Sequence, residues 1–137
     1  MSTSGYSGTA LVKKLGIKPA MKLSIVNAPP GYFGWLETDI RPQLIKPREL
    51  PDFIHLFVKT ALQFEQEMAK VLAIAAIHKQ VIIWVSWYKK SAKIPTDITE
   101  DLIRNYALKN GLVDIKVCAV NELWSGLKLV VPLKMRH

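Results

Sequence analysis

The stretch that decides the fold runs from Val81 to Lys90 and reads Val-Ile-Ile-Trp-Val-Ser-Trp-Tyr-Lys-Lys. Its first seven residues carry no charge, which is typical of a central parallel strand covered on both faces. A helical segment follows to about Asn110, and alternating apolar segments follow at 113–120 and 127–131. This order of strand, helix, strand, turn and strand predicts an α/β fold.

Two further strands are predicted upstream. Residues 21–26 alternate as a strand does, and Asn27-Ala-Pro-Pro-Gly31 ends them because proline has no amide hydrogen for a sheet. Residues 53–58 form a buried apolar run, and the T-x-x-Q pattern at 60–63 predicts the start of a helix that continues to about residue 77. Residues 32–50 give no clear pattern, apart from a short strand near 44–46.

The last helix and hairpin complete the predicted fold. Asp97 and Glu100 are spaced for reciprocal capping of the helix, and Asn110-Gly111 is typical of its end. The two final strand segments are close enough for an antiparallel hairpin, with 121–126 as the turn. We therefore predict a three-layer, Rossmann-like sandwich with a mixed, mostly parallel sheet that ends in this hairpin.

Length and composition predict one domain over residues 1–137, in which 1–20 form an N-terminal arm. No apolar run reaches the roughly 18 residues of a membrane span, and the N-terminus lacks the regions of a signal peptide. We therefore expect a cytoplasmic protein without a membrane partner. Half of the residues are hydrophobic and the mean hydropathy is +0.14, so a homodimer is also a plausible assembly.

Residues with catalytic chemistry are few. Cys118 is the single cysteine, so an internal disulfide is excluded, and its alternating strand pattern predicts a core residue. The three histidines, His55, His78 and His137, have no metal-ligand spacing. No phosphate-binding glycine loop, nucleophile elbow or H-E-x-x-H pattern occurs. We therefore assign no metal, no cofactor and no catalytic residue, and a non-enzymatic role is favoured.

The net charge of +8 favours anionic partners, although it also keeps an apolar domain soluble. In open α/β sheets ligands bind beyond the carboxyl ends of the strands, where three segments are predicted to converge. Lysines beside a helix amino end can hold an anion there, and a solvated basic loop is the alternative. The candidate ligand-binding residues are Asn27, Gly31, Lys59, Thr60, Trp87, Lys89, Lys90 and Ser91.

Several blocks carry a resemblance to a known family. They are Ser4-Gly-Tyr-Ser-Gly-Thr9, Lys13-Lys-Leu-Gly-Ile17, 84–91, 96–101, 111–119 and 124–127. Through them the chain resembles a family of small uncharacterised bacterial proteins that is known only as a domain of unknown function. The resemblance implies a cytoplasmic bacterial protein and supplies no activity or site residue. Tyr88 and Pro30 depart from the family pattern, which implies a proline and an acidic residue at these positions.

The order of elements is also similar to the later half of the Rossmann-like methyltransferases. In that group a glycine-rich turn lets a nucleotide-like cofactor approach the backbone. Here Asn27-Ala-Pro-Pro-Gly31 offers one glycine and two prolines. Binding of S-adenosylmethionine is therefore not expected.

Three functions stay open at this point. The first is an accessory domain that binds a small anionic ligand or a protein partner through the candidate residues. The second is a degenerate methyltransferase-like enzyme that uses residues 27–31. The third is a nucleic-acid-binding protein in which Trp87 and Tyr88 stack on bases beside Lys89 and Lys90.

Overall fold

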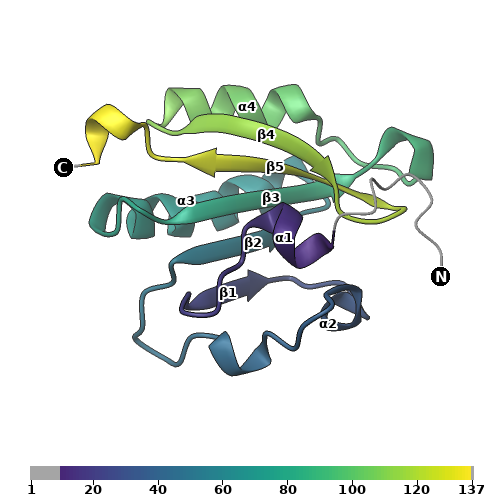
Figure 1. Cartoon of the computed structure of the whole chain (residues 1–137). Helices are drawn as coiled ribbons and strands as arrows, with labels where there is room; N and C mark the ends of the chain where they lie inside the picture. Colours follow the sequence, from purple (N-terminus) through teal and green to yellow (C-terminus); the bar gives the residue numbers. More distant parts are fainter. Residues whose placement is uncertain (1–9, 137) are drawn as a thin grey trace.

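A computed structural model describes residues 10–136 as one five-stranded sheet with helices on both faces (Figure 1). The strands are β1 (Leu23–Val26), β2 (Phe53–Phe57), β3 (Ile82–Tyr88), β4 (Val113–Ala119) and β5 (Trp124–Val130). The helices are α1 (Leu11–Leu15), α2 (Tyr32–Trp35), α3 (Ala61–Ile77) and α4 (Glu100–Lys109), with 3-10 turns η1 (Arg41–Gln43), η2 (Lys90–Ala92) and η3 (Leu133–Met135). The block at 4–9 and the first part of the predicted arm lie outside the described residues.

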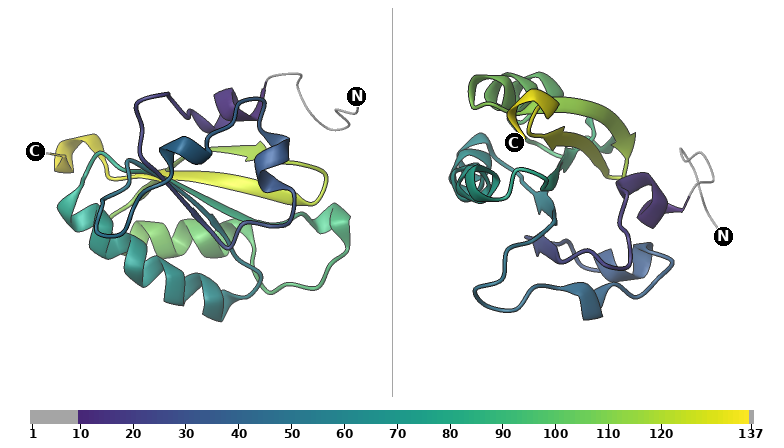
Figure 2. Two further views of the ribbon diagram at one scale, coloured as in Figure 1. Left: turned by 90° about the horizontal axis from the view of Figure 1, so that it is seen from below. Right: turned by 60° about the vertical axis from the view of Figure 1, so that its left-hand side comes forward.

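The strand order in the sheet is β1-β2-β3-β5-β4. β1, β2 and β3 pair in parallel, while β5 runs antiparallel to both of its neighbours, β3 and β4. α3 and α4 cover one face, and α1 and α2 lie on the other (Figure 2). The predicted three-layer, Rossmann-like α/β fold with its terminal hairpin is therefore confirmed. Among the described residues, no helix combines the length and apolar composition that crossing a bilayer requires.

The core beneath α3 and α4 follows from the apolar run of β3. Ile83, Val85 and Trp87 alternate along the strand and point to this side, where they meet buried residues of both helices. The helical contribution comes from Phe64, Met68, Val71, Ala75, Ile103 and Ala107. One side of α3 is thus part of the core.

The opposite face is covered by short helices and loops. Trp84 is fully buried there, and its indole Nε1 donates to the carbonyl of Leu15 at 2.9 Å. α1 ends at Gly16, whose φ of 79° is the left-handed conformation that glycine adopts without steric cost. Trp84 is therefore both a packing partner of α1 and a hydrogen-bond donor to its last residue.

A buried polar chain crosses this second core. The hydroxyl of Tyr32 lies 2.9 Å from Nδ1 of His55, and Nε2 of His55 lies 2.7 Å from Oγ of Ser86. All three side chains are almost completely buried. Burial lowers the pKa of His55 to about 3 and raises that of Tyr32, so both groups are neutral at pH 7.

Three local features differ from the predictions. Thr99, not Asp97, caps α4, since its side chain accepts from the amide of Leu102. β5 begins at Trp124, so residues 124–126 are strand and not turn. The unclear region 32–50 contains α2 and η1, and the strand expected near 44–46 is a single bridge between Leu44 and Leu23.

Candidate functional site

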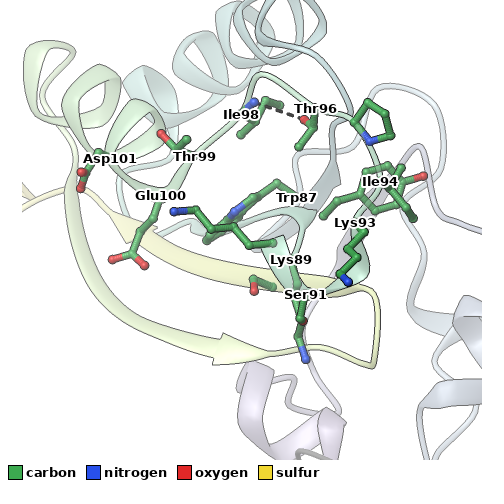
Figure 3. Close-up of a pocket in the computed structure, with 14 residues that line it drawn as sticks. Trp87, Lys89, Ser91, Lys93, Ile94, Thr96, Ile98, Thr99, Glu100 and Asp101 are labelled. Carbon is green, nitrogen blue, oxygen red and sulfur yellow. Dashed lines mark hydrogen bonds between the residues drawn. The ribbon is translucent and has the colours of Figure 1, made fainter.

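A cavity of about 900 Å³ lies at the carboxyl end of β3 (Figure 3). It is bordered by the ends of β3 and β5, by the segment that follows β3, and by the first turn of α4. Trp87 and Ser125 are directly opposite each other in the antiparallel pairing of β3 and β5. Because opposite residues share a sheet face, these two side chains form a common floor on the α4 side.

The charges around this cavity are unequal. Lys90 and Lys93 are exposed at its rim, and none of the ion pairs found within residues 10–136 involves either of them. The acidic residues on the α4 side, Glu100 and Asp101, both pair with Arg104. Within the described part of the chain, Lys90 and Lys93 are therefore cations at the rim that no ion pair engages, whereas the carboxylates of the α4 side share one guanidinium.

Arg104 holds the acidic wall in place. Besides Glu100 and Asp101, it binds Asp114 of β4 with an Nε–Oδ2 distance of 3.0 Å. Hydrogen bonds from Arg104 to Glu100 and then to Asp114 raise the pKa of the guanidinium. The side chain of Arg104 thus ties the first turn of α4 to the edge of the sheet.

The turn that carries the lysines has a strained backbone. Lys93 has a φ of 55°, and its amide donates to the carbonyl of Lys90 at 3.0 Å. A non-glycine residue in this conformation costs on the order of 1 kcal/mol. The fold therefore holds the backbone of this turn in an unfavourable conformation at Lys93.

The structure brings together half of the predicted site residues. Trp87, Lys89, Lys90 and Ser91 line the cavity, whereas Asn27, Gly31, Lys59 and Thr60 are not among its lining residues. Asn27 donates from its side chain to the carbonyl of Phe57 at 3.3 Å, and Gly31 precedes α2. Asn27 and Gly31 thus have structural roles in the loop after β1.

The anion site predicted at the start of α3 stays a prediction, and groups of the chain itself already occupy part of this helix end. Two of its amides already have partners: Ala61 donates to Oδ1 of Asp97 at 2.7 Å, and Gln63 donates to Oγ1 of Thr60 at 3.1 Å. The side chain of Gln63 accepts from the amide of Lys59. Asp97 reaches across from the segment before α4, so a carboxylate of the chain itself holds the place expected for a ligand.

Replacing Asp97 with alanine is expected to lower the free energy of unfolding by about 1–2 kcal/mol, because it removes the acceptor at the start of α3. Urea unfolding measures the change. Asp97→Asn is the matched variant, and it keeps an oxygen acceptor while losing the charge. An Asp97→Ala protein as stable as the original would contradict this capping role.

The base-stacking surface predicted from Trp87 and Tyr88 is also not formed. The two side chains alternate on β3, so Trp87 points towards α4 while the ring of Tyr88 packs on Trp124 with a centroid distance of 4.3 Å. Trp87 itself is 7% exposed. Adjacent residues of a strand cannot share one stacking surface.

Metal and thiol chemistry find no support in the described part of the chain. No group of three or more His, Cys, Asp or Glu that could hold a metal occurs within it. Burial raises the pKa of Cys118, although Lys14 and Lys116 oppose this effect. The thiol is therefore not activated as a nucleophile.

Sheet order and helical layers define a Rossmann-like mixed α/β protein. No protein-family model and no curated protein matches the chain. Among solved structures, it is similar to a crystal structure from Sulfolobus solfataricus that is provisionally assigned as a type 11 methyltransferase. The match has a TM-score of 0.49 and 15% identity, and covers 85% of this chain and 88% of that chain. This likeness implies nothing about activity, and membership of the domain-of-unknown-function family stays a prediction.

Proposed function

We propose that this protein is a non-catalytic binding protein that holds a small anionic ligand in the cavity at the end of β3. The observation that carries the proposal is the placement of Lys90 and Lys93 at the rim of a cavity whose carboxylates are paired with Arg104. An anion placed there meets two ammonium groups, while Arg104 holds the nearby Glu100 and Asp101. Charge-assisted hydrogen bonds from such groups are stronger than neutral ones.

Two hydroxyl groups add to this recognition. Ser91 and Ser125 line the cavity, and no hydrogen bond within the described residues engages either side chain. By contrast, Thr96 donates to Lys59 and Thr99 caps α4, so these hydroxyls are already used. Ser91 and Ser125 are therefore available as hydrogen-bond donors to an anion that Lys90 and Lys93 attract.

We expect the Lys90→Ala/Lys93→Ala variant to bind pyrophosphate or adenosine monophosphate about tenfold more weakly, or worse, because two charged donors are lost. Isothermal titration calorimetry at low salt measures this change. Native mass spectrometry of gently purified protein precedes it, since it reports any retained ligand and the number of subunits.

The matched control is Lys70→Ala. Lys70 lies on α3, its side chain is 76% exposed, and it faces Glu67 at 3.7 Å. The control should bind the probes like the unmodified protein. If the double variant bound every probe with the same affinity as the unmodified protein and the control, that result would show that Lys90 and Lys93 do not contribute to the binding site.

The other functions stay open as proposals. Titration with S-adenosylmethionine at millimolar concentration tests the methyltransferase-like enzyme, and saturable heat would favour it. A protein partner or a homodimer would show as additional mass or as a doubled subunit mass in the native spectrum.

A further inference from the structure

A second group of cations lies on the sheet face that carries α1, away from the cavity. We call this group the basic face, and it consists of Lys14, Lys116, Lys128 and Arg136. Lys116 and Lys128 are paired directly opposite each other in the register of β4 and β5. Opposite residues share a face and their side chains lie close together.

The direction of these side chains follows from strand alternation. Leu127 and Leu129 belong to the core under α3 and α4, so Lys128 between them points to the other face. On β3 the residue opposite Lys128 is Trp84, which belongs to the core on that other face. One row across the sheet thus reads Trp84, Lys128 and Lys116.

This row is covered at one end and open at the other. α1 lies over Trp84, but Figure 1 shows no helix in front of β4 and β5 towards the C-terminal end. Lys116 is exposed and Lys128 is half-buried. The cations are therefore accessible from the side opposite α3 and α4.

The arrangement is unfavourable for the isolated protein. Burial lowers the pKa of Lys128, and the positive charges of Lys116 and Arg136 lower it further. None of the ion pairs found within residues 10–136 involves Lys116, Lys128 or Arg136. Like charges placed directly opposite on a sheet are destabilising, so an anion bound here would relieve the repulsion.

Lys14 extends the basic face along β4. Its Nζ donates to the carbonyl of Ala119 at 2.9 Å, and both Lys14 and Lys116 act on the pKa of Cys118 between them. Arg136 lies at the other end, where its Nε donates to the carbonyl of Val131. The four cations therefore follow the hairpin from its turn to its open end.

We propose that the basic face binds the phosphate backbone of nucleic acid without reading its sequence. An elongated row of cations matches the regular charge of a polynucleotide. Protein partners are instead held mainly by aromatic or apolar anchors at the centre of an interface. Here lysines occupy that place, and the aromatic side chain of the same row, Trp84, is fully buried. This surface is distinct from the one predicted around Trp87 and Lys90.

The test is fluorescence anisotropy with a labelled single-stranded oligonucleotide of about fifteen nucleotides at rising salt. With four phosphate contacts, the slope of log K against log salt is expected to be about −3. In the variant Lys116→Gln/Lys128→Met, the slope should fall to about −1.5, with roughly tenfold to a hundredfold weaker binding at about 50 mM salt. Methionine keeps the apolar stem of Lys128, which limits damage to the fold.

The matched control is Lys70→Gln/Lys109→Gln, which removes the same charge from α3 and α4 on the opposite face. Absence of oligonucleotide binding, or equal losses in both double variants, would overturn the proposal. Equal affinity and slope for polyglutamate would replace it with an acidic protein partner. The Lys90→Ala/Lys93→Ala protein should keep its oligonucleotide binding. The proposal for the cavity and the proposal for the basic face are therefore tested independently.

A stability measurement shows whether Lys116 of the basic face repels Lys128 or stabilises the fold. At low salt, Lys116→Gln is expected to raise the melting temperature by about 1–4 °C, because one of two opposed charges is removed. The difference should shrink at high salt. A lower melting temperature for this variant would show that Lys116 stabilises the fold and would contradict the repulsion argument.

Discussion

Acidification from pH 6.5 towards pH 3 is expected to destabilise the protein steeply through His55. Burial lowers the pKa of this imidazole from 6.5 to about 3 in the folded state. The unfolded chain therefore binds a proton below pH 6.5 that the folded protein does not bind, and stability falls as the pH falls. The expected slope is about 1.4 kcal/mol per pH unit, and the full difference is about 5 kcal/mol.

The variant His55→Gln isolates this effect. Glutamine keeps a donor and an acceptor for Tyr32 and Ser86 but does not titrate. Urea unfolding between pH 6.5 and 4.5 should show a slope that is smaller by about one proton in the variant. Equal slopes in the two proteins would mean that His55 is protonated in the folded state.

The second large effect is expected for Trp84→Ala, which should lower the free energy of unfolding by about 3–5 kcal/mol. Trp84 is completely buried in the middle of the sheet, and its Nε1 donates to Leu15 of α1. The substitution leaves a cavity and an unpaired carbonyl, so α1 should also lose its attachment. Hydrogen exchange of the amides in α1 should rise more than exchange in α4.

Trp84→Phe separates packing from hydrogen bonding. It keeps most of the aromatic volume and removes only the donor to Leu15, which should cost about 1–3 kcal/mol. Faster exchange in α1 with little change in the rest of the sheet is the expected signature. If both variants destabilised the protein equally, the hydrogen bond would account for the whole effect.

Much of the architecture was predictable because local signals agreed with the fold. The uncharged run of β3 marks the centre of the sheet, and Thr60 and Asn110-Gly111 mark helix ends that the structure confirms. The start of β5 was missed because Ser125 and Gly126 resemble turn residues. Gly126 lies in the strand, where an added Cβ would come within 3.1 Å of the Trp84 ring.

The candidate site was only half predictable, because it depends on contacts between distant segments. Asp97 lies near α4 in the sequence and was expected to cap it, but Thr96 binds the carbonyl of Lys59 and carries Asp97 to α3. Likewise, Ser125 joins Trp87, and Lys116 joins Lys128, only through the strand register. No local pattern in the sequence specifies that register.

The irregular edge strand also bears on the solubility of the protein at high concentration. β4 ends the sheet, and Ile115 and Val117 are 53% and 46% exposed there, which would invite edge-to-edge stacking of copies. A register shift between Asp114 and Lys116 interrupts the ladder, and Lys116 places a charge beside it. The same lysine that we assign to polyanion binding thus protects the free protein from fibre-like association. If Lys116 is neutralised, by substitution or by a bound polymer, only the register shift between Asp114 and Lys116 should still oppose this association.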